Sequence, residues 1–397
     1  KNLSIFDKIN HLVCRKCKID NYDLFVQNLA GNIDSNSELF KSILSEILST
    51  VDKKNKDLTF QLLSFDEYRS LGRKRAPNFI YDRKDIYALA EYYQNKLNEE
   101  NRRDEIDLTK IALDLLEKND SEAFKFDLVV CDEVQDFTEI QLQLIFKLAK
   151  DYNNILFSGD PKQIINPSGF RWEEVKNKFF ERGVNVPEVV PLKLNFRSVG
   201  SIVKFANSLL DLKQKLVGIS NTEYREEYKF NGKPIAVIHK IKESEMLSKL
   251  KISSAGRIIL VRDSNEMVKL KRELKSELIF TISDAKGLEF DTVLVWKFLN
   301  GKKSKDIWRK IEDNSANTEE RAPYIKNEIN LLYVASTRAR TNLIFYDGEK
   351  ESEIWKIESL EEHIYKTNDT VALSEVWNKI SSPKDWEKQG DYFFERE

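Results

Sequence analysis

The sequence has 397 residues, of which 41% are hydrophobic and 33% are charged, so it can build buried cores and excludes disordered, collagen-like or low-complexity classes for the bulk of the chain. Its 64 basic and 66 acidic residues leave a net charge of −2, which excludes a globally basic nucleic-acid binder but allows a local basic groove. No apolar run approaches the roughly 18 residues of a membrane-spanning helix, and residues 1–9 lack the pattern of a signal peptide.

Three cysteines, an odd number in a long chain, favour a reducing, cytoplasmic compartment. Cys14 and Cys17 have the spacing of a CxxC pair. A closed zinc site needs four ligands, and no second pair follows nearby. We therefore interpret these cysteines as ordinary thiols rather than as a metal or redox centre.

Residues 1–120 are predicted to be mainly helical, because apolar residues recur there at the spacing of one helix face. Two such series are Leu39, Ile43, Leu44, Ile47 and Leu48, and Ile86, Leu89, Ala90 and Tyr93.

From Phe126 onward, short apolar runs alternate with amphipathic stretches, which predicts an α/β fold with parallel sheets and helices on both faces. The predicted strands are residues 126–131, 155–157, 189–194, 235–241, 258–261, 279–282, 292–296 and 343–346. The predicted helices include residues 139–149, 201–210, 267–274 and 328–339. Residues 300–322 are charged and poor in apolar side chains, so we expect a surface excursion there.

Two adjacent acids, Asp132 and Glu133, directly follow the first of these strands. A buried parallel strand would place both carboxylates at its carboxyl end, the sheet edge where ligands bind in open α/β folds. Phosphoryl transfer uses such a pair, in which one acid holds Mg²⁺ and the other orients and deprotonates the attacking water. For a bare acid pair, a solvated acidic turn would be the preferred interpretation, so the segments that follow decide the matter.

The string Asp132-Glu133-Val134-Gln135-Asp136 resembles motif II of the superfamily 1 helicases of the UvrD/Rep type. Further segments resemble later motifs of that family, in order: residues 157–163 motif III, 194–198 motif IV, 283–290 motif V and 332–340 motif VI. Gly169-Phe170-Arg171 resembles the aromatic–arginine step that closes motif III. The resemblance covers residues 126–346. It implies two RecA-like parallel-sheet lobes with ATP hydrolysed between them.

In the first lobe, the resemblance implies that Asp132 coordinates Mg²⁺ and that Glu133 activates water. Gln163 would sense the γ-phosphate, because an amide can donate to phosphate and accept from water.

In the second lobe, the resemblance implies that the guanidinium groups of Arg197 and Arg338 reach the γ-phosphate and neutralise transition-state charge. Phe196 would stack on the adenine. Gly287 and Glu289 would complete the nucleotide site, with Glu289 contacting the ribose.

The family also implies binding of nucleic acid, with single-stranded DNA favoured. Phe170 and Trp172 are candidates to stack on bases, although a place in the core is a serious alternative for Phe170. A basic cluster around Arg73, Lys74 and Arg75 can follow a phosphate backbone, and a solvated, partly paired loop is an equal alternative.

The chain departs from the family pattern at motif V and in the length of the second lobe. Ser283 stands where the family usually has a histidine that faces nucleic acid. Arg197 and Lys286 are 89 residues apart (286 − 197), too close for the accessory subdomain that larger relatives insert there. The resemblance therefore implies a compact second lobe.

The largest departure is that no GxxxxGK[ST] phosphate loop, the family's motif I, occurs in the sequence. We therefore expect a first lobe truncated at its N-terminus: a helical accessory region at 1–120, the rest of the first RecA-like lobe at 121–192, and the second lobe at 193–397. A segment or another chain would supply motif I. Two alternatives stay open, a helicase-like binding module that lost ATP cleavage and one half of a split helicase.

Overall fold

The computed structural model describes residues 63–70, 83–99, 102–118, 125–165, 170–185, 189–219, 223–251, 254–299, 307–309, 311, 318–378 and 380–394. The chain divides into two compact units, Lys1–Val189 and Val190–Glu397. Both contain parallel strands and helices, so the predicted α/β class is confirmed. Among the described residues, no helix has the length and apolar character needed to cross a membrane.

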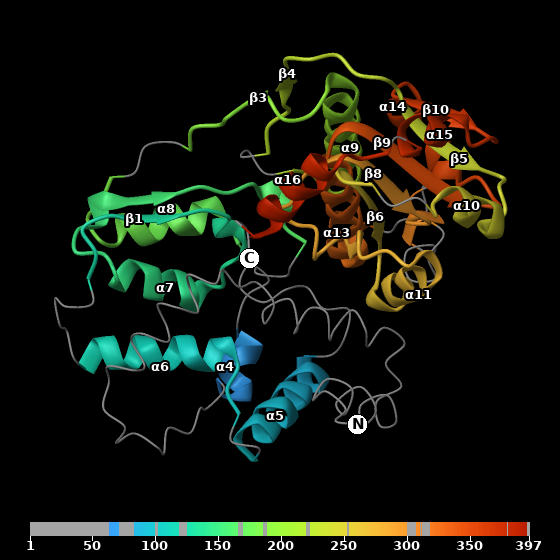
Figure 1. Ribbon diagram of the computed structural model, residues 1–397. Helices are drawn as coiled ribbons and strands as arrows, with labels where there is room; N and C mark the ends of the chain where they lie inside the picture. Colours follow the sequence, from blue (N-terminus) through green and yellow to red (C-terminus); the bar gives the residue numbers. More distant parts are fainter. Residues whose placement is uncertain are drawn as a thin grey trace. The chain divides into compact units, whose positions relative to one another are not determined.

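The described part of residues 1–120 is helical and comprises α4 (Phe65–Ser70), α5 (Arg83–Glu99) and α6 (Glu105–Lys118) (Figure 1). Leu89 and Tyr93 are buried on α5, as their spacing predicts. Arg83 donates to the backbone carbonyls of Tyr68 and Arg69, each at 3.0 Å, and so fastens α5 to the end of α4. The predicted helical series at residues 39–48 and the cysteines Cys14 and Cys17 lie outside the described residues.

The first unit contains a parallel pair of strands, β1 (Val129–Cys131) and β2 (Ile155–Phe157), in which Val129 lies opposite Ile155. Helices α6, α7 (Glu139–Lys147) and α8 (Trp172–Phe180) supply most of the core that this sheet covers. The predicted strand at 126–131 is wrong in its first half, because Phe126 makes only an isolated bridge to Ala149.

The expectation that β1 is buried on both faces is also wrong. Val129, Cys131, Ile155 and Phe157 pack against the core, but the alternate side chains point the other way. Leu128, Val130 and Leu156 are 65%, 57% and 59% exposed. An apolar run predicts a strand, but it does not determine whether a second layer covers the strand.

The second unit contains a parallel sheet with the strand order β10-β5-β9-β8-β6-β7 (Figure 1). The strands are β5 (Ile235–His239), β6 (Arg257–Val261), β7 (Ile279–Thr281), β8 (Phe290–Trp296), β9 (Ala339–Gly348) and β10 (Ile364–Thr367). Every neighbouring pair in this sheet is parallel. Such a sheet agrees with the RecA-like lobe that the sequence predicts.

Helices cover both faces of this sheet, as the near-continuous apolar strands predict. On one face, Leu294 and Trp296 pack with residues of α10 (Glu243–Lys249), α11 (Ser264–Leu274) and α15 (Val371–Trp377). On the other, the ring of Phe345 in β9 lies 5.7 Å from that of Phe205 in α9 (Gly200–Val217), which packs against α13 (Thr318–Thr337).

Two further predictions need correction. Of the strand predicted at residues 189–194, only Leu194 is in a strand, in β3 (Leu194–Asn195), which pairs with β4 (Glu227–Tyr228). Pro191 before it has no N–H to donate to a ladder. Trp308 and Ile311 are buried inside the stretch predicted as a surface excursion, and helix α13 begins there at Thr318. Among the described residues, three α-helices follow the last motif: α14 (Glu358–Glu361), α15 and α16 (Pro383–Phe394).

Candidate functional site

In the first unit, the predicted acid pair lies where β1 ends. Asp132 is exposed, and Glu133 adopts a left-handed backbone (φ 51°) before the turn η2 (Val134–Asp136). Such a conformation is uncommon for a residue with a side chain and is typical of sharply turned functional loops. It turns the chain away from the strand at the acid pair itself.

Gln135 joins the acid pair to the end of β2. Its side chain is fully buried, its amide donates to a carboxylate oxygen of Glu133, and its carbonyl oxygen accepts from the backbone N–H of Asp160 at 2.9 Å. At Gly159 an added Cβ would lie 2.3 Å from that same oxygen, so only glycine leaves room for this contact. Motifs II and III are thus tied together by one glutamine that the sequence analysis assigned no role.

Gln163, the predicted phosphate sensor, lies in the turn η4 (Pro161–Gln163) after β2. Its amide donates to a carboxylate oxygen of Asp160 at 3.0 Å. Asp160 also accepts from the backbone N–H of Lys162, so it caps this turn. Asp132, Glu133 and Gln163 are therefore presented by two loops that Gln135 holds together.

The donor set at this edge fits a magnesium ion that arrives with a nucleotide. Among the described residues, no three His, Cys, Asp or Glu side chains converge as a metal site. Mg²⁺ is commonly held by one or two carboxylates, with waters and substrate phosphates as its other ligands. The single exposed carboxylate of Asp132 is compatible with that pattern.

In the second unit, residues from motifs IV, V and VI meet in one ion cluster. Glu289 directly precedes β8, and its carboxylate lies 2.6 Å from Nε of Arg197 and 3.0 Å from the guanidinium of Arg340. The carboxylate is largely buried, whereas the two guanidinium groups are about half exposed. Sequence analysis placed Arg197 and Glu289 at one site but gave Arg340 no role, although it lies in the same motif VI string.

Phe196 and Gly287 flank this cluster in the sequence. The ring of Phe196 is exposed, and Nζ of Lys229 lies 5.4 Å from its centre, which places a cation over an aromatic face that a base could otherwise occupy. Gly287 has a φ of 81° and open space around a Cβ, so it serves the turn of motif V rather than a close approach.

Arg338 is not at the surface that its predicted role requires. It is 1% exposed, and its guanidinium donates to the carbonyls of Val334 and Leu288 and to the hydroxyl of Thr337. The residue lies between the end of α13 and the start of β9, and its donors satisfy the backbone at that corner. In this conformation Arg338 supports motif V through the carbonyl of Leu288. Contact with a phosphate would require it to leave these partners.

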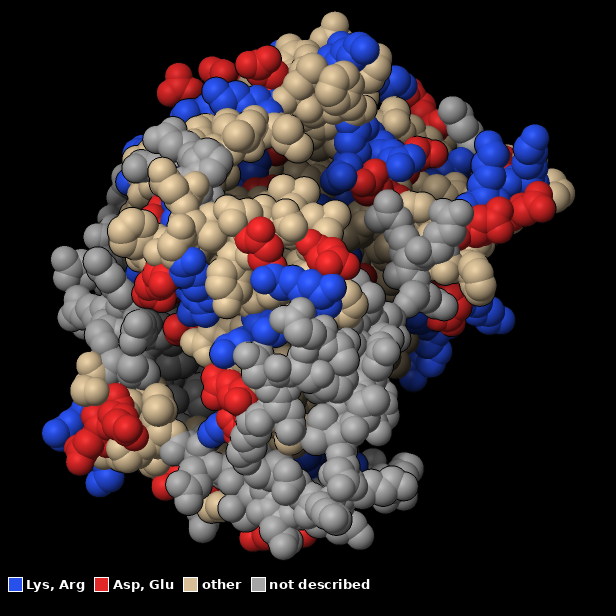
Figure 2. Space-filling model, turned by 90° about the vertical axis from the view of Figure 1, so that its left-hand side faces the viewer, with Lys and Arg blue, Asp and Glu red and all other residues tan. Residues whose placement is uncertain are grey.

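The predicted base-stacking residues belong to the core of the first unit. Trp172 is 7% exposed, so stacking on a base would require it to leave the core, and that role stays a prediction. Phe170 is partly buried, and its ring lies 5.2 Å from that of Trp172 in an edge-to-face contact. Arg73, Lys74, Arg75 and Gly169 lie outside the described residues. On the face shown in Figure 2, the coloured basic and acidic side chains are interspersed.

Two protein families match this chain. The UvrD/REP helicase N-terminal domain matches residues 1–182, and the UvrD-like helicase C-terminal domain matches residues 278–347. The chain belongs to the UvrD/Rep-like family of superfamily 1 helicases. The second match spans motifs V and VI, including Glu289 and Arg340.

Three relatives illustrate the range of proteins to which the chain is similar. Human "TPR and ankyrin repeat-containing protein 1" is 27% identical over 83% of this chain and 13% of its own length. The "Probable DNA helicase II homolog" of Mycoplasma capricolum is 25% identical over 72% of this chain and 40% of its own. "ATP-dependent DNA helicase PcrA" of Bacillus subtilis is 28% identical over 56% of this chain and 30% of its own. The chain thus spans well under half the length of these relatives.

Proposed function

We propose that this chain is the C-terminal portion of an ATP-dependent helicase or translocase that moves along single-stranded DNA. The observation that carries the proposal is the assembly of family motifs within each unit. In the first, Gln135 joins motif II to motif III; in the second, Glu289 joins motif V to motifs IV and VI. If these motif residues were only solvated surface side chains, there would be no reason for them to bind one another across separate strands.

In the proposed reaction, Asp132 holds the Mg²⁺ that accompanies ATP, and Mg²⁺ supplies charge neutralisation at the phosphates. Glu133 takes a proton from the attacking water, and the amide of Gln135 fixes the orientation of its carboxylate. Gln163 contacts the γ-phosphate. Arg197 and Arg340 contribute positive charge, and both are partly solvent-accessible beside Glu289.

The 397-residue chain by itself is proposed to be inactive, because it has no GxxxxGK[ST] loop. That loop supplies the backbone N–H groups and the lysine that hold the β- and γ-phosphates. Positioning accounts for most of phosphoryl-transfer catalysis, and neither a carboxylate pair nor distant arginines can replace a missing cradle. A segment or chain that supplies motif I is therefore part of the proposal.

The test compares the 397-residue chain with the complete natural protein in steady-state phosphate release, with single-stranded DNA and Mg²⁺ present. In the complete protein, Glu133→Gln should abolish most turnover and leave ATP binding largely intact, because it removes the base but keeps shape and polarity. Robust release by the 397-residue chain, lost on Glu133→Gln, would refute the proposed inactivity.

A catalytically dead, helicase-like binding module is the second candidate. One observation favours it: Arg338 is buried and donates to backbone carbonyls instead of standing at the surface. If the complete protein binds single-stranded DNA but releases no phosphate, this candidate replaces the first.

A further inference from the structure

Helix α16, which follows all the helicase motifs, is hydrogen-bonded to the amino ends of two strands of the second sheet. The backbone N–H of Gly256, just before β6, donates to Oε1 of Gln389 at 2.7 Å. The backbone N–H of Glu289, just before β8, donates to the hydroxyl oxygen of Tyr392 at 2.7 Å. One turn of α16 thus satisfies two N–H groups at this edge.

Aromatic packing holds the same turn of α16 in place. The ring of Phe393 lies 6.0 Å from that of Phe280 and 6.1 Å from that of Phe290. The ring of Tyr392 meets Phe290 edge-to-face at 6.4 Å. Rings at these separations contribute beyond the apolar area they bury, so the contact does not depend on the two hydrogen bonds alone.

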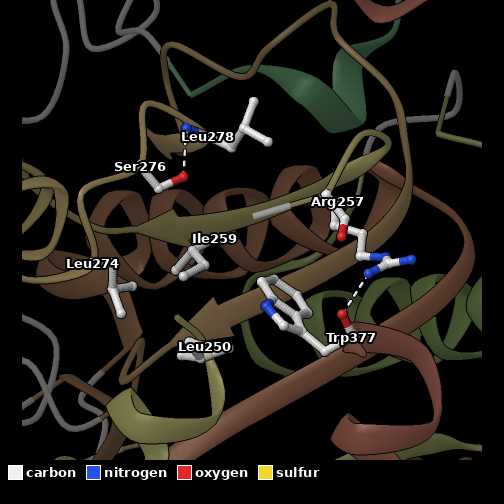
Figure 3. Close-up of a pocket in the computed structure, with 8 residues that line it drawn as sticks. Leu250, Arg257, Ile259, Leu274, Ser276, Leu278 and Trp377 are labelled. Carbon is white, nitrogen blue, oxygen red and sulfur yellow. Dashed lines mark hydrogen bonds between the residues drawn. The ribbon is translucent and has the colours of Figure 1, made fainter. Parts of the chain in front are cut away.

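The segment before α16 is anchored at the same sheet edge. Arg257, the first residue of β6, donates to the backbone carbonyl of Trp377 at the end of α15, and Figure 3 shows this contact beside the apolar side chains of Leu250 and Ile259. Together with Gln389 and Tyr392, this contact fastens the chain from residue 377 to residue 392 along the starts of β6 and β8.

The residue that Tyr392 holds is the centre of the ion cluster. The Glu289 carboxylate binds Arg197 and Arg340, while its own N–H is bound by Tyr392. Two residues before it, Gly287 has a φ of 81°, so the turn that leads to Glu289 depends on a glycine backbone. An open pocket of about 540 Å³ is lined by both Glu289 and Arg340 from the motifs and by Gln389 and Tyr392 from α16.

We propose that α16 is a positioning element for the nucleotide contacts of the second unit, and that Tyr392 and Gln389 are its positioning residues. Tyr392 fixes the backbone of Glu289, and Glu289 in turn fixes the guanidinium groups of Arg197 and Arg340. The inference rests on the proposed function, because those three side chains are taken as nucleotide contacts. It adds a determinant that lies outside every helicase motif and 52 residues (392 − 340) beyond the last of them.

The first experiment uses the 397-residue chain and Tyr392→Phe, which keeps the ring and removes only the hydroxyl. Amide hydrogen exchange at Glu289 should accelerate by about tenfold or more, since the N–H loses its acceptor. The Nε–H resonances of Arg197 and Arg340 should broaden or move. Phe394→Ala is the matched control, because Phe394 lies on the same helix and is 83% exposed; it should change neither signal.

The second experiment measures ATP turnover by the complete natural protein. Tyr392→Phe should raise KM for ATP by about three- to tenfold, because Glu289 and the arginines also bind the nucleotide in the ground state, and it should lower kcat, because the arginines neutralise charge in the transition state. Partial unfolding would instead lower kcat and leave KM unchanged. Gln389→Ala, which keeps the Tyr392 contact, should give a smaller rise of KM in the same direction.

Unchanged exchange and unchanged arginine resonances in Tyr392→Phe would overturn the proposal, and so would faster exchange with an unchanged KM. If the unmodified complete protein does not hydrolyse ATP, the proposed function fails. The exchange and resonance measurements then still decide whether α16 sets the geometry of the ion cluster.

Discussion

The β1–β2 sheet of the first unit and the six-stranded sheet of the second unit differ in how the described residues cover their faces. In the second unit, consecutive residues of β8 such as Leu294 and Val295 are both buried, because helices lie on both faces. In the first unit, Cys131 packs against the core while its neighbour Val130 is exposed. Within the part of the chain that the structure describes, the same apolar pattern thus accompanies a sheet buried on both faces in the second unit and on one face in the first.

This difference teaches that apolar side chains on a strand do not contribute equally to stability. The free energy gained by burial scales with the area removed from water. Val130 and Leu156 remain in contact with solvent, so they gain little from the fold as described, whereas Leu294 gains the full amount. The acid pair of the proposed ATP site therefore stands at the end of the less supported of the two sheets.

The largest expected effect is a difference in stability loss when a leucine is truncated in each of the two units. Leu294→Ala should lower the free energy of unfolding of the second unit by about 2–5 kcal/mol, because it leaves a cavity at a fully buried position. Leu128→Ala should cost the first unit less than about 1 kcal/mol, since its side chain is mostly in water. Urea titration followed by hydrogen exchange of β1 and β8 peptides measures both. Equal losses would mean that Leu128 is covered.

Much of the candidate site could be predicted from the sequence, because its chemistry lies in contiguous strings. Asp132 and Glu133 could be placed at a strand end from the apolar run before them, and Glu289 could be assigned from motif V. The contacts between strings could not be predicted in the same way. Gln135 binding Asp160, and Arg340 sharing Glu289 with Arg197, depend on the register of strands far apart in the chain.

Other errors have different physical causes. The prediction of a strand at residues 189–194 was wrong because it rested on apolar composition alone. Pro191 cannot donate a hydrogen bond to a neighbouring strand. The burial of Arg338 could not be read from its motif, since two of its partners are backbone carbonyls, which any sequence provides. Tyr392 lies outside every helicase motif, so the motifs gave no reason to assign it a role. The aromatic run Tyr392-Phe393-Phe394 in an otherwise charged segment was the signal that could have pointed to it.

A second prediction compares adjacent positions by thiol labelling. Burial, with a smaller contribution from the Asp132 charge, raises the pKa of Cys131 to about 12. Little thiolate then exists near neutral pH, so Cys131 should react with iodoacetamide about 30-fold more slowly than an ordinary thiol at about pH 8. A cysteine introduced by Val130→Cys should react at the ordinary rate, because that position is exposed.

The matched pair for this experiment lies in β8. Cysteines introduced by Leu294→Cys and by Val295→Cys should both be protected, because both faces of that strand are covered. Peptide mass spectrometry resolves each site, including the natural cysteines Cys14 and Cys17. Fast labelling at both Cys131 and the Val130→Cys position, or slow labelling at both, would remove the distinction between the two faces of β1.

A third prediction concerns Gly159, which leaves room for the glutamine that joins the two loops of the acid site. Gly159→Ala should cost about 1–3 kcal/mol, because the new Cβ would meet the buried Gln135 at 2.3 Å and force it to move. Gly390→Ala in α16 is the control: nothing lies within 4 Å of its Cβ, and alanine is the better helix former, so stability should stay or rise. Thermal unfolding measures both, and a neutral Gly159→Ala would show that Gln135 is not tightly held.

The smallest expected effect is a loss of stability of the second unit at mildly acidic pH. His239 and His363, the histidines among the described residues, both lie there. Burial lowers the pKa of each, and for His239 the nearby Glu351 only partly opposes this shift.

A lowered folded-state pKa means that, below about pH 6.5, the unfolded chain binds a proton more readily than the folded chain. The stabilising contribution is therefore fully present above that pH and is lost as the pH falls. Denaturation midpoints of β8 peptides should decline between about pH 7 and pH 5. His239→Gln should make that decline shallower, because it removes one of the two titrating groups. The β1 peptides of the first unit should not respond to His239→Gln, so a response there would show that the two sheets do not unfold separately.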